Sequence, residues 1–249
     1  MKRLRIVGMG PGGVDQVTVE AVQALNEVDV FFVFDKGIDD LIALRQEILD
    51  RHTDGRARLH ALPDPERDRD PTSYENAVSA WHENRAIDFE DAIAMLADDE
   101  VGGFLTWGDP ALYDSTARIV ERILARGNVS FDWDIVPGLS SVQLLTARHR
   151  IMLNRVGESV VYTTGRRLAE RVAAGDTDLV VMLDGHLQCA DLEGDWDIWW
   201  GANLGTSDEA LVAGRLADVL DEIRVAREVS KERRGWVMDV YLLRRRTGP

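Results

Sequence analysis

Short apolar runs alternate with amphipathic stretches along most of the chain, and this alternation predicts strands and helices in turn. The run Asp29–Phe34, DVFFVF, is almost continuously apolar, as expected of a parallel strand buried on both faces. In a helix predicted over Thr18–Glu27, the apolar residues Val19, Val22 and Leu25 recur every three positions. Because strands and helices alternate throughout, the pattern predicts an α/β fold.

The same pattern of apolar and polar positions predicts the remaining strands and helices. Further strands are predicted at Leu4–Gly8, Ala57–Leu62, Val101–Trp107, Phe131–Val136, Ser159–Thr164, Leu179–Leu183, Asp197–Ala202 and Val237–Leu243. Further helices are predicted at Asp40–Asp50, Ser73–Ala97, Ser115–Arg126, Ser140–Ala147, Arg167–Ala174 and Glu209–Arg227. The pattern restarts after Pro137, so we expect two α/β domains, residues 1–137 and 138–249, with a ligand cleft between them. The charged loop Pro63–Pro71 is either solvated or a lid.

Three of the predicted strands end in turns rich in Gly and Pro. These turns are Val7–Gly13 (VGMGPGG), Trp107–Tyr113 (WGDPALY) and Val136–Ser141 (VPGLSS). In open α/β sheets, ligands bind at the carboxyl ends of the strands. The three turns therefore predict one ligand site assembled from distant segments of the chain.

The first turn has three interpretations: a dinucleotide site, a site for another small ligand, or a turn without a ligand. The glycines of Gly8–Gly13 spell G-x-G-x-x-G after a strand, and Asp35 ends the next strand, where a dinucleotide-binding protein carries its ribose-binding acid. Against a dinucleotide, Pro11 has no N–H to offer a pyrophosphate. The following helix also starts late, with Asp15 or Thr18 as its N-cap, so its dipole is poorly placed for phosphate. A dinucleotide, another small ligand and a plain turn all remain open.

The second turn places a carboxylate at the end of a strand. Gly108 allows a ligand to approach closely and Pro110 fixes the turn. Asp109 could accept hydrogen bonds from a ligand amine or hydroxyl, or it could cap the helix that follows. Leu112 and Tyr113 would supply an apolar wall.

In the third turn, either Ser140 or Ser141 could cap a helix or face a ligand. The turn does not match G-x-S-x-G, so no serine hydrolase is predicted. The histidines lack metal-binding spacing and Cys189 is the single cysteine, so no metal site is predicted. The histidines are interpreted as structural or exposed residues, and the strongest catalytic candidate among them is His82, next to Trp81 in a predicted helix.

Composition narrows the class of partner. With 29 Lys and Arg against 44 Asp and Glu, the net charge is −15, which argues against nucleic acid. One cysteine permits no disulfide within the chain, as is usual in a reducing cytoplasm. The chain contains no apolar run of the roughly 18 residues that a membrane span needs. We therefore expect a soluble cytoplasmic protein that binds neither membrane nor nucleic acid.

In this order, the three turns resemble those of the tetrapyrrole methylase family. Its members open with a V-G-x-G-P-G strand and turn, carry a central G-D-P-x-x-Y, and have P-G-x-S-S at the domain junction. The resemblance runs from Arg5 to Arg246 and includes HRIMLNRVG from His149 and the closing RGWVMDVYLLRRR. It departs at Met182–Gly185, where many members have a Met-Gly pair.

The resemblance implies a fold, a cofactor and a set of contacts. It implies two α/β domains with S-adenosylmethionine folded in the cleft between them, becoming S-adenosylhomocysteine, and a homodimer. The residues that match the family's cofactor contacts are Pro11, Gly108, Asp109, Leu112, Ser140, Ser141, Leu183, Ala202, Met238 and Asp239. The long segment after Asp35 fits members that act on a precorrin in cobalamin biosynthesis. Among these, the subgroup that the sequence resembles most methylates precorrin-5 at C1 and releases the acetyl group of that substrate as acetate.

Such a reaction makes two chemical demands. Methyl transfer from a sulfonium is an in-line displacement that needs positioning and desolvation. Deacetylation needs a directed water, for which a general base would help; the candidates are Asp35, Tyr113, Asp114 and His82. Arginines should bind the substrate carboxylates, with Arg85, Arg166 and Arg167 as candidates. The alternatives are another precorrin methyltransferase, a dinucleotide-dependent oxidoreductase, or a module that only senses S-adenosylmethionine.

Overall fold

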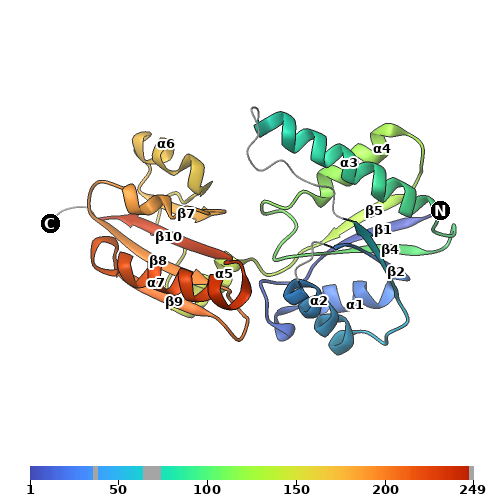
Figure 1. The fold of residues 1–249 in the computed structure, drawn as a ribbon, viewed down its shortest axis with the longest axis horizontal. Coiled ribbons are helices and arrows are strands. Elements are labelled where there is room, and N and C mark those ends of the chain that lie inside the picture. Colours follow the sequence, from blue (N-terminus) through green and yellow to red (C-terminus); the bar gives the residue numbers. More distant parts are fainter. Residues whose placement is uncertain (36–38, 64–73, 247–249) are drawn as a thin grey trace. The chain divides into compact units, whose positions relative to one another are not determined.

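The computed structural model describes residues 1–35, 39–63 and 74–246 of the protein. The chain divides into two compact units, which are coloured along the sequence in Figure 1. The first unit is Met1–Gly10 with Val14–Leu139, and the second is Pro11–Gly13 with Ser140–Pro249. Each unit contains a five-stranded sheet with helices packed on it. The predicted α/β fold is therefore confirmed.

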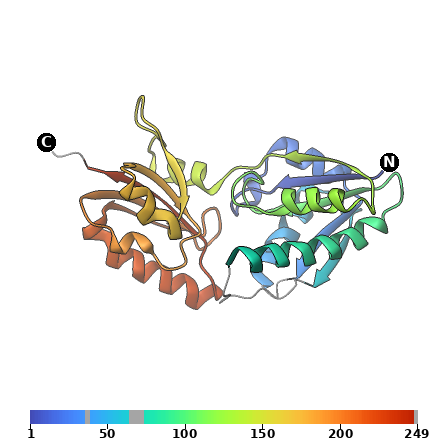
Figure 2. The ribbon, with the colours of Figure 1, turned by 90° about the horizontal axis from the view of Figure 1, so that it is seen from above.

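The sheet of the first unit is parallel. Its strands are β1 (Arg3–Gly8), β2 (Val30–Asp35), β3 (Arg58–Pro63), β4 (Val101–Thr106) and β5 (Asp132–Val136). They lie in the order β3-β2-β4-β1-β5, with parallel pairing between neighbours. The helices are α1 (Val19–Glu27), α2 (Asp39–His52), α3 (Tyr74–Ala94) and α4 (Thr116–Arg126). All five strands thus end at the same edge of the sheet (Figure 1 and Figure 2).

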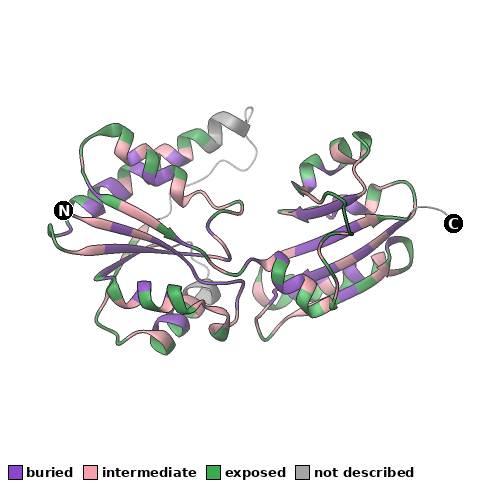
Figure 3. Ribbon diagram, turned by 180° about the vertical axis from the view of Figure 1, so that it is seen from behind, coloured by how far each residue is buried: buried purple, intermediate pink, exposed green. Residues whose placement is uncertain are grey.

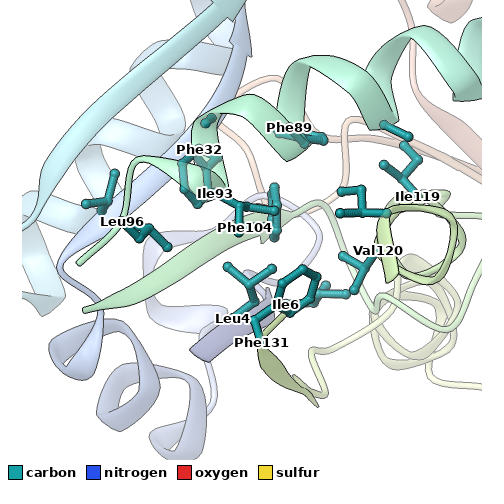
Figure 4. Close-up of a cluster of buried hydrophobic side chains, with 14 residues drawn as sticks. Leu4, Ile6, Phe32, Phe89, Ile93, Leu96, Phe104, Ile119, Val120 and Phe131 are labelled. Carbon is teal, nitrogen blue, oxygen red and sulfur yellow. The ribbon is translucent and has the colours of Figure 1, made fainter. Parts of the chain in front are cut away.

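Alternate residues of the strands in the first unit pack on opposite faces. Leu4 and Ile6 of β1 belong to a cluster with α3 and α4, whereas Val7 belongs to a cluster with α1 and α2. Figure 4 shows the first cluster, in which the rings of Phe89 and Phe104 meet edge to face with centroids 4.7 Å apart. Figure 3 shows buried residues along the strands and exposed ones on the outer sides of the helices. These two apolar layers hold the strand ends in place.

The sheet of the second unit is mixed. Its strands are β6 (Val161–Thr164), β7 (Asp178–Met182), β8 (Trp196–Ala202), β9 (Ala210–Arg215) and β10 (Asp239–Arg245), in the order β6-β7-β10-β8-β9. β10 runs antiparallel to both β7 and β8. The helices are α5 (Ser141–His149), α6 (Leu168–Ala173) and α7 (Leu216–Arg234). Leu179 and Val181 of β7 pack with α6 and α7, and Val180 packs with α5.

One predicted element was wrong. The sequence predicts a helix over Glu209–Arg227, but Ala210–Arg215 forms β9, and α7 runs from Leu216 to Arg234. Ala and Leu favour helices locally, yet this segment pairs with β8 and buries Val212 while leaving Leu211 exposed. Tertiary pairing therefore overrides local propensity here. The bounds of the other predicted elements differ from the observed ones by three residues or fewer.

Ile93 offers a test of the core in Figure 4, because it is fully buried there on α3. We expect Ile93→Val to lower the free energy of unfolding by about 1 kcal/mol, since removing one methylene leaves a small void. Urea denaturation followed by circular dichroism measures this change. The control is Ile87→Val, the same substitution in the same helix at a residue that is 38% exposed. Equal losses at the two positions would contradict the packing of α3 described here.

Candidate functional site

The topology of the first unit brings the three glycine- and proline-containing turns to one place. β4, β1 and β5 are neighbours in the sheet, and the turns follow these three strands. In the register of the sheet, Gly8 lies opposite Thr106, and Val7 lies opposite Val136. The segments 8–10, 107–110 and 137–139 therefore start side by side at the carboxyl edge, as the sequence predicts.

Backbone hydrogen bonds join the first two turns. The amide of Met9 donates to the carbonyl of Thr106 over 2.9 Å. The amide of Gly108 donates to the carbonyl of Gly10 over 2.9 Å, and that of Gly10 donates back to Gly108 over 3.3 Å. The two turns therefore form an isolated antiparallel bridge.

Asp109 joins the second turn to the third. One carboxylate oxygen accepts a hydrogen bond from the amide of Ala111 (2.7 Å), and the other accepts one from the amide of Gly138 (3.2 Å). The alternative that Asp109 caps the following helix is wrong, because α4 begins at Thr116 and its N-cap residue is Ser115. The carboxylate instead holds two turns together.

The three turns meet so closely that side chains would not fit. A Cβ built on Gly8 would lie 2.6 Å from the nitrogen of Gly138, and one built on Gly138 would lie 2.8 Å from the carbonyl carbon of Gly8. At Gly108, by contrast, a Cβ would meet nothing nearer than the carbonyl oxygen of Leu139, at 3.9 Å. The backbone is thus tightly packed where Gly8 meets Gly138, whereas a ligand has room to approach the backbone of Gly108.

This geometry does not suit a dinucleotide. The amides of Met9 and Gly10, which a pyrophosphate would need as donors, already donate to the second turn. The first long helix, α1, begins only at Val19, and the hydroxyl oxygen of Thr18 accepts a hydrogen bond from the amide of Ala21 (3.0 Å). The N-cap is therefore Thr18, whereas Asp15 lies in a short 3-10 turn. The positive end of the α1 helix dipole is therefore at Thr18, eight residues along the chain from Gly10.

The two serines of the third turn have different surroundings. Ser140 is the N-cap of α5, and its hydroxyl accepts a hydrogen bond from the amide of Gln143 (3.3 Å). The Gln143 side chain accepts in return from the amide of Ser140 (2.7 Å), which completes a capping box. Ser141 is the first residue of α5 and has no such role in the cap.

In the second unit, four more of the predicted residues meet at one edge of the sheet. Asp239, which starts β10, lies opposite Ala202 at the end of β8, and the next residue of β10 lies opposite the last residue of β7. Leu183 directly follows β7, with a left-handed backbone (φ +54°) and 62% of its surface exposed. The amide of Asn203 donates to the carbonyl of Met238 over 2.8 Å. Leu183, Ala202, Met238 and Asp239 thus converge, although they are distant in sequence.

Beneath this edge lies a buried polar cluster. Arg227 of α7 forms an ion pair with Asp239, whose carboxylate also accepts a hydrogen bond from the indole of Trp200 (2.9 Å). Burial raises the pKa of Asp239, while the charge of Arg227 opposes that rise. The hydroxyl of Tyr241 donates to the carboxylate of Asp184 over 2.5 Å, and burial raises the pKa of Tyr241 well above its ordinary value.

Cys189 lies within this cluster, and its reactivity is predictable. The residue has no exposed surface, and burial raises the pKa of its thiol to about 12, against roughly 8.5 for an exposed cysteine. We therefore expect the native protein at pH 8 to resist Ellman's reagent, because little thiolate forms and the sulfur is inaccessible. The unfolded protein in guanidinium should release one equivalent of chromophore at once. Rapid reaction of the native protein would contradict this burial.

A family model for tetrapyrrole (corrin/porphyrin) methylases matches residues 3–220. The chain belongs to this family. A precorrin-6A synthase (deacetylating) from Sinorhizobium sp is 42% identical over 250 residues, which cover 98% of this chain and 96% of that protein.

Two solved structures extend the comparison. A cobalamin synthesis related protein (CobF) from Corynebacterium diphtheriae matches with a TM-score of 0.86 and 35% identity, over 98% of this chain and 99% of that one. A uroporphyrin-III C-methyltransferase from Thermus thermophilus, complexed with S-adenosylhomocysteine, matches with a TM-score of 0.56 and 17% identity, over 97% and 96% of the two chains. At that identity the second match shows the shared fold alone.

The catalytic candidates in this tetrapyrrole methylase lie in three places. Tyr113 ends the second turn, with a left-handed backbone and 41% of its surface exposed. Asp114 follows it and accepts a hydrogen bond from the amide of Thr116 (2.7 Å). Asp35 ends β2, beside β4, and its side chain lies outside the described residues. His82 is buried on α3. The loop Pro63–Pro71 also lies outside the described residues, apart from its first residue, which ends β3.

The arginine candidates differ in their surroundings. The guanidinium of Arg85 is buried and lies 3.9 Å from the ring centroid of Trp81. Arg167 forms an exposed ion pair with Glu170, and Arg166 is exposed beside it. Arg85 belongs to the first unit, whereas Arg166 and Arg167 both belong to the second.

Sequence reasoning missed three residues near the two edges. Arg45 of α2 is half-buried; burial lowers its pKa, which the charge of Asp114 opposes. Nothing in the sequence distinguishes Arg45 from other helix arginines. Asn203 is buried with a left-handed backbone (φ +49°), and its signal was an Asn directly after a buried strand. The sequence predicts a helix that ends at Arg227, where an arginine is expected to be exposed. The observed α7 continues to Arg234, and the burial of the Arg227 side chain could not be predicted.

Proposed function

We propose that this protein is an S-adenosylmethionine-dependent C-methyltransferase that methylates precorrin-5 at C1 and releases acetate, giving precorrin-6A. The observation that carries this proposal is the 42% identity, over 98% of the chain, to a precorrin-6A synthase (deacetylating). The meeting of three turns at one sheet edge supports a ligand site there.

We assign one set of cofactor contacts to the three turns and to the start of α5. Gly108 leaves its backbone open to close approach, and Asp109 holds the neighbouring turns in register. Leu112, a half-buried residue beyond them, provides apolar contact, and Pro11 does the same from the segment grouped with the second unit. We assign hydroxyl contact at the start of α5 to Ser141, because Gln143 engages both the amide and the hydroxyl of Ser140. Ser140 then contributes by fixing the helix start.

We assign further cofactor contacts to the sheet edge where β7, β8 and β10 meet. Leu183 offers an exposed apolar side chain, and Ala202 and Met238 offer backbone groups at the same edge. Because the carboxylate of Asp239 is occupied by Arg227 and Trp200, we assign Asp239 a contact through its backbone. Such an edge suits the flat, uncharged adenine ring better than it suits a phosphate.

When bound, S-adenosylmethionine supplies the methyl group from its sulfonium. The chain's own contribution is to orient the substrate carbon in line with that group and to exclude bulk water. Water cleaves the C1 acetyl group, with acetate as the leaving product, so one residue must direct that water. Our candidates remain Asp35, Tyr113, Asp114 and His82. We favour Asp114, because its carboxylate lies just after the second turn, accepts a hydrogen bond from the amide of Thr116 and interacts electrostatically with Arg45.

Calorimetric titration with S-adenosylhomocysteine, and separately with NADH, tests the cofactor assignment. We expect micromolar binding of the first and no binding of the second, because the amides of the glycine loop are already engaged. Binding of NADH alone would overturn the proposal in favour of an oxidoreductase. Binding of S-adenosylhomocysteine without turnover of any precorrin would favour a sensing module.

The wider expectations remain predictions. Homodimer formation, a cytoplasmic location and the lack of nucleic-acid or membrane partners follow from the resemblance and the composition. Among the described residues, no helix is long and apolar enough to cross a membrane. The same residues include no cluster of three or more His, Cys, Asp or Glu side chains suited to a metal.

A further inference from the structure

Arg227 connects the two strand ends that form the edge of the second unit. One guanidinium nitrogen pairs with the carboxylate of Asp239, at the start of β10. The other donates to the carbonyls of Asp184 (3.1 Å) and Gly185 (3.0 Å), directly after Leu183. A single side chain on α7 therefore bonds both segments that carry proposed cofactor contacts.

The loop that Arg227 holds has several restraints of its own. The carboxylate of Asp184 accepts hydrogen bonds from the amides of Gln188 (2.7 Å) and His186 (3.3 Å). Its carbonyl is one of the two that Arg227 binds. Leu183, immediately before, adopts a left-handed backbone that an apolar residue rarely takes. Such a backbone persists only where the surrounding contacts enforce it, and Arg227 bonds to the two residues that follow.

Stability alone does not explain this arrangement. The side chains of Arg227 and Asp239 are each 5% exposed, so both charges are removed from water. Buried ion pairs of this kind are often no more stabilising than apolar residues of similar volume. A planar guanidinium, however, fixes the directions of its donors and so fixes the groups that accept from them.

We propose that Arg227 is a positioning residue for the cofactor, which sets Leu183 against the Met238–Asp239 backbone through the Asp184 and Gly185 carbonyls and the Asp239 carboxylate. This inference rests on the proposed function of the same edge. Arg227 is not placed in contact with the cofactor itself. Its effect passes through the two segments it joins.

The same sheet provides a matched control at its opposite edge. Asp178 starts β7 and is fully buried, with ion pairs to Arg155 and to Arg244 of β10. Because β7 and β10 are antiparallel, this cluster and the Arg227–Asp239 pair lie at opposite ends of the same two strands. Changes at Asp178 should affect stability without affecting the cofactor edge.

The test uses the double variant Arg227→Met/Asp239→Asn, because the single variant Arg227→Met leaves a buried carboxylate without its cation and could fail to fold. The double variant removes both charges. We expect its melting temperature to lie close to that of the native protein, while its dissociation constant for S-adenosylhomocysteine rises by roughly tenfold, as expected for lost positioning hydrogen bonds. Calorimetry and thermal denaturation measure the two quantities separately.

Two further variants decide the interpretation. Arg227→Lys keeps the charge but loses the planar fork, and should weaken binding by an intermediate factor. Arg155→Met/Asp178→Asn should lower the melting temperature yet bind S-adenosylhomocysteine within twofold of the native protein. Native affinity in the Arg227→Met/Asp239→Asn variant, or weakening as large in the control, would overturn the proposal. If the native protein itself fails to bind S-adenosylhomocysteine, the proposed function fails instead.

Discussion

Replacement of Asp109 by alanine is expected to raise the dissociation constant for S-adenosylhomocysteine by about 100-fold. The carboxylate accepts hydrogen bonds from the amides of Ala111 and Gly138, and so holds the second and third turns together. Hydrogen bonds to a charged group contribute about 1.5–3 kcal/mol each, and about 2.7 kcal/mol corresponds to a factor of 100. Calorimetric titration at a temperature where both proteins are folded measures the change.

Two substitutions control for this prediction. Asp109→Asn keeps one acceptor oxygen but presents an amide group that cannot accept from a second N–H, so an intermediate loss is expected. Asp132→Ala removes an exposed carboxylate at the amino end of β5, where it accepts from the amide of Trp133, and affinity should not change. If Asp109→Ala bound S-adenosylhomocysteine with native affinity, the second turn would not belong to the cofactor site.

Gly138→Ala is expected to lower kcat/KM by at least about 100-fold, since misplacing a binding element by about 1 Å can cost that much. The added methyl group would lie 2.8 Å from the carbonyl carbon of Gly8. This is a backbone atom, so it cannot rotate away as the end of a flexible side chain can. The third turn must then move away from the first, which separates the groups that Asp109 joins. Steady-state kinetics with the precorrin substrate, together with S-adenosylhomocysteine affinity, would measure the loss.

Gly127→Ala is the matched glycine control. Gly127 ends α4 with a left-handed backbone (φ +73°), and a Cβ there would meet nothing within 4 Å. The substitution therefore strains the backbone by about 1–2 kcal/mol without crowding any neighbour. It should lower stability and leave kcat/KM unchanged. A similar kinetic loss in both glycine variants would mean that general destabilisation, not the meeting of the turns, explains Gly138→Ala.

The sequence was sufficient for the architecture and for the edge of the first unit. The apolar runs at Asp29–Phe34 and elsewhere mark strands by local pattern, and the three turns are readable because Gly and Pro restrict the backbone locally. Their meeting followed from a general property of parallel sheets, that strand ends share an edge. The hydrogen bond between Asp109 and Gly138 could not be predicted from the sequence. The two residues are 29 positions apart, and β5 brings Gly138 near to Asp109.

The edge of the second unit was less accessible to sequence reasoning. Ala210–Arg215 has good helix formers and becomes a strand only because β8 is available to pair with it. The ion pair of Arg227 and Asp239 depends on where α7 crosses the sheet, and a charged residue in an amphipathic helix is usually solvated. The resemblance placed Asp239 among the cofactor contacts, whereas the structure shows how its side chain is occupied. A family resemblance is therefore better at predicting which positions belong to a site than at predicting which atom of each residue makes the contact.

The ratio of acetate released to methyl groups transferred tests the proposed reaction most directly. Precorrin-5 and S-adenosylmethionine labelled with carbon-13 in its methyl group are incubated with the purified protein, and both products are quantified by NMR. We expect one acetate for each methyl group, with the label on C1 of the tetrapyrrole. Methyl transfer to another carbon, or transfer without acetate, would contradict the proposed reaction and place the protein among the other methyltransferases of its family.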